Sequence, residues 1–106
     1  MSWRITYYNE NVEQSILQWP KKILAKYLKI IDLIIEEGPD LGMPLTKPMG
    51  NGLFEIRSKG QEGIARAFFC TIQDNEVIIL HDIVKKTENT PNKDLRIARK
   101  RLKEIK

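Results

Sequence analysis

The sequence predicts an α+β fold in the order β-α-α-β-β-β-α: a small twisted antiparallel sheet, two helices on one face and a basic helix at the end. Two observations carry this prediction. Residues 53–84 form three strand-like runs separated by short polar connections, which is typical of an antiparallel meander. Residues 23–37 instead repeat apolar side chains at helical spacing, and a second amphipathic pattern follows Pro91.

The first elements are a strand and a short helix. Residues 3–8 are rich in aromatic and β-branched side chains, which favour a strand. Asn11 followed by Gln14 resembles a capping box, so we expect a helix from there to about Trp19. Pro20 then suits the first turn of a second helix, where its missing N–H is not needed.

The second helix is predicted to pack its apolar side on the sheet and to end at Gly38-Pro39. Its apolar positions are Leu24, Tyr27, Leu28, Ile31, Ile34 and Ile35. Residues 39–52 hold three of the five prolines and three of the six glycines, so they are predicted to be irregular. A connection of this length often borders a functional site, and Lys47 is its only basic residue.

The meander carries cations within its strands. Glu55 and Arg57 share one face of the first strand, and Arg66 lies in the middle of the second. Arginine within a rigid sheet is costly unless it meets an anion, so these positions suggest a surface that holds phosphate. Residues 77–84 are apolar on both faces as far as His81, which predicts a strand in the interior of the sheet.

Thr90 and Pro91 are predicted to be the N-cap and first-turn residue of the final helix. Its apolar side is Leu95, Ala98, Leu102 and Ile105, and its basic side is Arg96, Arg99, Lys100, Lys103 and Lys106. With two helices on one face of the sheet, the other face is expected to stay partly open and lined with cations.

Composition limits the possible functions. The chain of 106 residues is predicted to form one domain, residues 1–106, with no room for a separate cofactor domain. One cysteine and one histidine exclude an internal disulfide and a Cys/His zinc site, and we expect no cofactor. No run of about 18 apolar residues and no signal-peptide pattern is present, so we expect a cytoplasmic protein without membrane contact.

The charge is unevenly distributed. The formal balance is −2 over residues 1–84 and +6 over residues 85–106, although the whole chain carries only +4. A basic end of this kind is typical of a solvated helix face, of nucleic-acid binding or of an acidic partner.

An ordered set of segments resembles the HigB-like branch of the RelE/ParE toxin superfamily, often labelled phage-derived toxin-like protein. The segments are Leu41-Gly42 to Lys47-Pro48, Gly52 to Arg57, Arg66-Ala67-Phe68-Phe69, and His81 through Lys85-Lys86-Thr87 to Thr90-Pro91. The resemblance covers nearly the whole chain and is strongest from Leu41 to Leu102. It implies a type II toxin with a microbial-ribonuclease-like fold that cleaves messenger RNA, usually on the ribosome.

The resemblance also implies partners and alternatives. Members of this branch usually pair with a helix-turn-helix antitoxin, and contact operator DNA only through it. The ParE-like branch instead inhibits DNA gyrase, and a third alternative is a regulatory member without activity. RelE-like nucleases often place a tyrosine near the C-terminus to stack on a base, whereas no tyrosine follows Tyr27 here. Stacking would then fall to Phe68, His81 or an arginine plane.

Cleavage without metal needs a base, an acid and a cation that stabilises the phosphorane. The resemblance gives the last role to Arg66, with Arg57 holding a neighbouring phosphate. Lys86, Lys85 or His81 would be the acid or base. Lys47, Arg96, Arg99 and Lys100 are expected to bind RNA. The alternatives are structural: Arg66 in a salt bridge to Glu55 or Asp82, His81 as a hydrogen-bonded core residue, and the lysines as a solvated turn.

Overall fold

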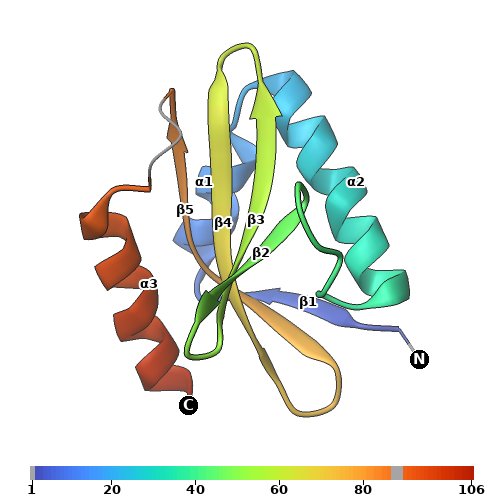
Figure 1. Ribbon diagram of the computed structural model, residues 1–106, viewed down its shortest axis with the longest axis vertical. Coiled ribbons are helices and arrows are strands. Elements are labelled where there is room, and N and C mark those ends of the chain that lie inside the picture. Colours follow the sequence, from blue (N-terminus) through green and yellow to red (C-terminus); the bar gives the residue numbers. More distant parts are fainter. Residues whose placement is uncertain (1, 87–89) are drawn as a thin grey trace.

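A five-stranded sheet with helices on both of its faces makes up the molecule (Figure 1). The computed structural model describes residues 2–86 and 90–106. The elements are β1 (Arg4–Tyr7), α1 (Glu10–Leu17), α2 (Lys21–Glu37), β2 (Thr46–Gly50), β3 (Leu53–Gly60), β4 (Gly63–Ile72), β5 (Glu76–Lys85) and α3 (Asn92–Ile105). The strand order is β1-β5-β4-β3-β2; β1 runs parallel to β5 and all other neighbours are antiparallel. The predicted α+β class and the meander are confirmed, and β5 lies inside the sheet as expected.

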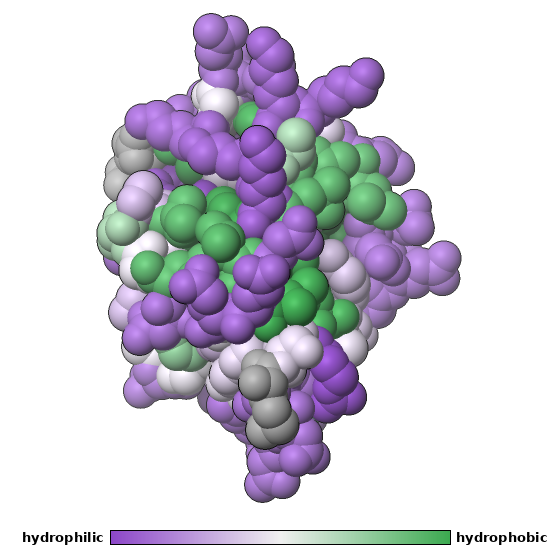
Figure 2. Space-filling view, turned by 90° about the vertical axis from the view of Figure 1, so that its right-hand side faces the viewer, coloured by the Kyte–Doolittle hydropathy of each residue, from purple (hydrophilic) through white to green (hydrophobic). Residues whose placement is uncertain are grey.

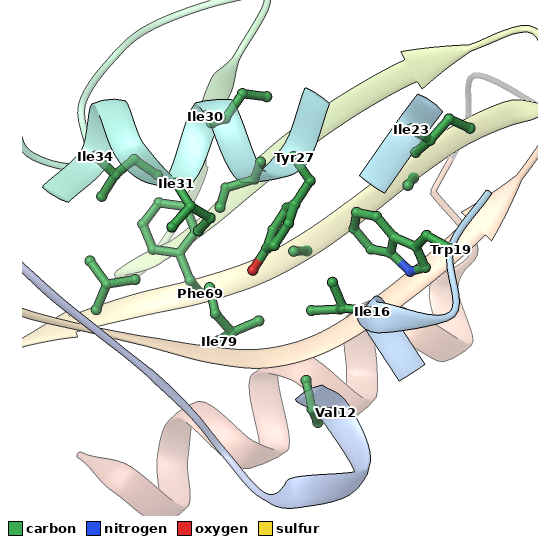
Figure 3. Packing of buried hydrophobic residues seen from close by; sticks show 14 residues of the cluster. Val12, Ile16, Trp19, Ile23, Tyr27, Ile30, Ile31, Ile34, Phe69 and Ile79 are labelled. Atoms are coloured by element: carbon green, nitrogen blue, oxygen red, sulfur yellow. The ribbon is translucent and has the colours of Figure 1, made fainter. Parts of the chain in front are cut away.

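The helices α1 and α2 cover the first face of the sheet and enclose the main core (Figure 3). The buried residues of α2 are Ile23, Tyr27, Ile30, Ile31 and Ile34. Leu28, predicted to be buried, is 46% exposed, because the apolar stripe of α2 is wider than the side that meets the strands. Burial raises the pKa of Tyr27, whose hydroxyl lies 3.2 Å from that of Tyr7.

Two predicted helix starts are wrong by a few residues. α1 begins after Asn9, whose side-chain Oδ1 accepts the backbone N–H of Val12 at 2.9 Å, so the cap is Asn9 and not Asn11. α3 has Pro91 at its N-cap position and no side-chain cap, and the hydroxyl of Thr90 is turned to another partner. Capping depends on the direction from which the chain enters the helix, and a local pattern does not fix this direction.

The prediction that residues 39–52 are irregular is wrong in part, because Thr46–Gly50 form strand β2 at the edge of the sheet. Proline has no N–H to donate to a neighbouring strand. It is tolerated in an edge strand because one side of that strand has no neighbour, so no hydrogen bond of the sheet is lost there. Pro48 therefore pairs with Phe54, and the register shifts between Pro48 and Gly50, where Gly50 has φ +91°. The strand matters for the site because it adds Lys47 to the sheet.

The second face of the sheet is covered in part by α3 (Figure 1). This helix packs on the end of the sheet where β3 and β5 begin and β4 ends. The buried residues of this layer are Leu53, Phe68, Cys70, Ile78, Leu80, Ala98 and Leu102. Burial raises the pKa of the Cys70 thiol, so Cys70 acts as a small apolar residue. The expected open face is thus confined to the other end of the sheet.

The outer side of α2 is partly apolar. Figure 2 shows hydrophobic patches there, with hydrophilic side chains at the upper end, where α2 begins and the β3–β4 hairpin turns. Two exposed apolar residues are Leu28 of α2, which is 46% exposed, and Met43 of the loop between α2 and β2, which is 59% exposed. Among residues 2–86 and 90–106, none of the helices is long and apolar enough to span a membrane.

Candidate functional site

Charged side chains from four strands gather on the second face of the sheet. They lie at the end of the sheet that α3 does not cover, where β3 and β5 end and β4 begins. Cross-strand register arranges them in three adjacent rows: Lys47–Glu55–Phe68–His81, Arg57–Arg66–Ile83 and Lys59–Ile64–Lys85. Residues two apart in a strand share a face, so the three rows lie on one side of the sheet. The bulge between Phe68 and Phe69 adds one residue to β5 and brings His81 opposite Phe68. The sheet thus brings together most of the residues that the sequence singled out.

Glu55 lies between two arginines at the centre of this face. Its Oε1 is 3.3 Å from Nε of Arg57, and its Oε2 is 3.8 Å from Nε of Arg66. Arg57 and Arg66 are directly opposite each other on β3 and β4. Like charges in this relation destabilise a sheet, and the carboxylate between them offsets the repulsion. Two cations and one carboxylate leave this cluster with a formal charge of +1.

The structural alternative for Arg66 is present in the fold. Arg66 is 0% exposed and Glu55 2% exposed, so the pair is fully buried. Asp82, the other predicted partner, lies on the opposite face, where its Oδ2 accepts from Ser15 Oγ at 2.8 Å and from Trp19 Nε1 at 2.9 Å. Asp82 therefore holds α1 on the sheet and is separated from the arginines.

Access to the cluster is limited on the side of α3. The hydroxyl of Thr90 donates to Oε2 of Glu55 at 3.3 Å. The same Oε2 lies 3.8 Å from Nε of Arg66. The side chain of Arg66 is fully buried, whereas that of Arg57 is 19% exposed. Of the two arginines, Arg57 is therefore the one that an approaching anion can meet in this structure.

His81 is held by a partner that sequence reasoning missed. Its Nε2 lies 2.7 Å from Oδ1 of Asp94, in the first turn of α3, and its ring stacks on Phe68 with centroids 6.3 Å apart. Both side chains of the His81–Asp94 pair are less than a fifth exposed. The only signal for Asp94 in the sequence is an acidic residue in a helical first turn, which normally reflects the helix dipole alone.

The remaining predicted lysines differ in position. Lys85 ends β5, pairs with Ile64 and is exposed on the face of Arg66. Lys86 follows the strand and is exposed; continued alternation would turn it toward the opposite face. Lys47 is exposed on β2, opposite Glu55. Thr87, quoted above for the resemblance, lies outside the described residues.

The basic residues of α3 lie away from the arginine pair. Arg96, Arg99 and Lys100 line a shallow groove of about 580 Å³ along the helix. Arg96 and Lys100 are exposed, whereas Arg99 donates to the backbone carbonyls of Met49 at 2.8 Å and Gly50 at 3.2 Å. Arg99 therefore fastens α3 to the β2–β3 turn, a role that the sequence did not predict.

A second hollow lies where β3 continues past the end of β2. It has a volume of about 350 Å³ and is lined by Lys26, Pro44, Leu45, Arg57, Lys59 and Ile64. Nζ of Lys26 donates to the backbone carbonyl of Lys59 at 3.3 Å, which ties α2 to the edge of β3. Neither Lys26 nor Lys59 is among the residues that the sequence singled out. The hollow joins both to Arg57.

Residues 14–103 match the family described as phage derived protein Gp49-like (DUF891). No curated protein matches the chain. The match to the family spans the second half of α1, all of α2, the whole meander and most of α3.

Solved structures share the fold at low sequence identity. A chain of the archaeal RelE–RelB complex from Pyrococcus horikoshii OT3 matches with a TM-score of 0.58 at 15% identity, over 84% of this chain and 100% of that chain. A chain of the YoeB–YefM complex from Staphylococcus aureus matches with a TM-score of 0.58 at 18% identity, over 80% and 99%. The YoeB dimer of the same organism matches with a TM-score of 0.55 at 19% identity, over 84% and 100%.

Proposed function

Because the chain belongs to the Gp49-like family of phage-derived proteins, a family of the RelE/HigB type, we propose that it is the toxin of a type II toxin–antitoxin system and cleaves messenger RNA without a metal ion. The observation that carries this proposal is the pair Arg57 and Arg66, directly opposite on two strands of a fold shared with RelE and YoeB structures. A sheet face with this charge suits a phosphodiester rather than an apolar ligand.

The reaction proposed is attack of the ribose 2′-hydroxyl on the adjacent phosphorus. The base removes the hydroxyl proton, the new O–P bond forms, and the bond to the 5′-oxygen breaks as the acid gives that oxygen a proton. The products are a 2′,3′-cyclic phosphate and a 5′-hydroxyl. DNA lacks the attacking hydroxyl, so it is not a substrate.

The roles follow from charge and access. Arg57 and Arg66 hold oxygens of the reacting phosphate, because a guanidinium binds two oxygens and stays charged at any working pH. Arg57 engages first, and binding moves Thr90 away from Glu55, which opens Arg66 to the same phosphate. Stacking of a base falls to His81, which is partly exposed and whose ring is backed by the buried Phe68.

His81 is our first candidate for proton transfer, and Lys85 is the second. Both lie on the face of the arginines, and Asp94 fixes the orientation of the imidazole. Lys86 remains a third candidate, at the end of the same strand. We place RNA or ribosome contacts on Lys47 and on the basic side of α3, with Arg96 and Lys100 exposed for them.

The proposed partner is an antitoxin. Two of the similar structures are complexes whose second component is RelB or YefM, which supports a protein partner for this chain as well. We expect a helix-turn-helix antitoxin that brings the complex to operator DNA, and a cytoplasmic location where messenger RNA and ribosomes are present.

The test is primer-extension mapping of a defined messenger RNA incubated with the protein, with and without translating ribosomes. We expect codon-phased cuts on ribosomes, since they supply positioning that this small surface lacks. Cuts on naked RNA would support the nuclease activity and show that it does not depend on ribosomes. A protein that stops growth without cutting RNA would contradict the proposal and favour a protein target such as gyrase.

His81→Gln is expected to lower kcat for RNA cleavage by about 100-fold, the usual contribution of a positioned acid or base. The measurement is single-turnover cleavage at saturating RNA. Lys29→Gln, at an exposed lysine of α2 that has no assigned role in the site, is the control and should stay within about twofold of wild type. If His81→Gln retains full activity while Lys85→Gln loses it, the proton-transfer role belongs to Lys85.

A further inference from the structure

A hollow of about 350 Å³ lies beside β3. We propose that Lys26, Arg57 and Lys59 bind a phosphate of single-stranded RNA next to the one that is cleaved. The inference rests on the proposed function, but it concerns a separate place: the edge of the sheet between α2 and the loop before β2. Lys26 and Lys59 belong to no part of the site predicted from the sequence.

The lining of this hollow has the charge that a phosphate needs. Three of the six described lining residues are cations and none is acidic; Pro44, Leu45 and Ile64 supply apolar walls. Arg57 already pairs with Glu55 at 3.3 Å, but an anion in the hollow would still be attracted by all three cations at once. The walls also lower the local polarity, which strengthens a charge-assisted hydrogen bond.

Local structure holds two of the three cations in position. The bond from Lys26 to the carbonyl of Lys59 bridges α2 and β3 and keeps the ammonium group at the hollow. The backbone N–H of Arg57 donates to the carbonyl of Leu45 at 2.9 Å, which closes the wall on the loop side. An ammonium group has three N–H donors, so Lys26 retains donors for a phosphate while it keeps the carbonyl.

Arg57 connects the hollow with the central cluster. It lines the hollow and is also the cross-strand neighbour of Arg66. The row with Lys59 lies directly beside the row with Arg57 on the same face. A strand of RNA whose reacting phosphate lies at Arg57 and Arg66 therefore continues toward Lys59 and Lys26. The apolar walls suit the sugar between the two phosphates.

The test is binding of a fluorescent single-stranded 2′-O-methyl oligonucleotide, which cannot be cleaved because its 2′-oxygen is blocked. Affinity is measured by anisotropy over a range of salt concentrations. Lys26→Ala and Lys59→Ala are each expected to weaken binding about fivefold and to reduce the salt slope by about 0.7, the value for one phosphate contact on a single strand. Lys29→Ala, a matched exposed lysine of α2 outside the hollow, should change affinity less than about twofold.

Cleavage kinetics separate this proposal from the proposed nuclease activity. A remote phosphate contact adds binding that is the same in substrate and transition state, so Lys26→Ala should raise KM and leave kcat unchanged. If Lys26→Ala and Lys59→Ala behave like Lys29→Ala, the subsite is wrong while the nuclease stands. If wild type binds the oligonucleotide through these lysines and never cleaves RNA, the subsite stands and the activity is wrong. Failure of wild type to bind the oligonucleotide would overturn the subsite, while the nuclease activity would still be decided by primer extension on ribosomes.

Discussion

Replacing Arg66 by lysine should lower the rate of messenger-RNA cleavage by about 100- to 1,000-fold, the range for loss of one preorganised donor to a developing negative charge. Lysine keeps the positive charge beside Glu55, so the ion pair that stabilises the sheet is retained. It loses the planar fork that binds two phosphoryl oxygens at once. The effect should therefore appear in kcat rather than in folding.

The measurement is single-turnover cleavage by wild type and Arg66→Lys, together with urea unfolding of both proteins. Arg4→Lys is the matched control, because Arg4 is also a strand arginine paired with a glutamate, Glu76, at 3.3 Å, but lies outside the site. Its cleavage rate should equal that of wild type. If Arg66→Lys cleaves within about threefold of wild type, Arg66 serves only as the structural partner of Glu55.

The sheet face could be predicted because strand alternation is local. The period of two placed Glu55 and Arg57 together, and short polar connections on both sides of β4 fixed the order of β3, β4 and β5. These two features placed Arg57 and Arg66 on adjacent strands, whereas their direct pairing depends on the register that the structure shows.

Contacts between distant segments could not be predicted in this way. The partner of His81 lies on α3, and the lysine that completes the hollow lies on α2; both positions depend on how each helix docks on the sheet. Thr90 illustrates the same limit, since its sequence context favours a helix cap and the fold uses it on Glu55.

Glu55→Gln should reduce the free energy of unfolding by about 3 kcal/mol, because it removes the buried carboxylate that pairs with both Arg57 and Arg66. An amide accepts the same hydrogen bond from Thr90, so the loss reports charge and not shape. Urea unfolding measures it. Glu76→Gln is the control, and the loss of its ion pair with the exposed Arg4 should cost less than about 1 kcal/mol.

The double variant Glu55→Gln, Arg66→Met distinguishes a buried charge from a lost contact. If the cost of Glu55→Gln comes from leaving Arg66 buried beside a second arginine, removing that guanidinium as well should recover part of the stability, since a buried pair can often be replaced by apolar groups without loss. Additive losses would mean that each side chain stabilises the sheet by packing alone. A recovery would mean that this sheet holds Arg66 at a cost that Glu55 offsets. Such a cost is expected where a buried cation is retained for a phosphate rather than for the fold.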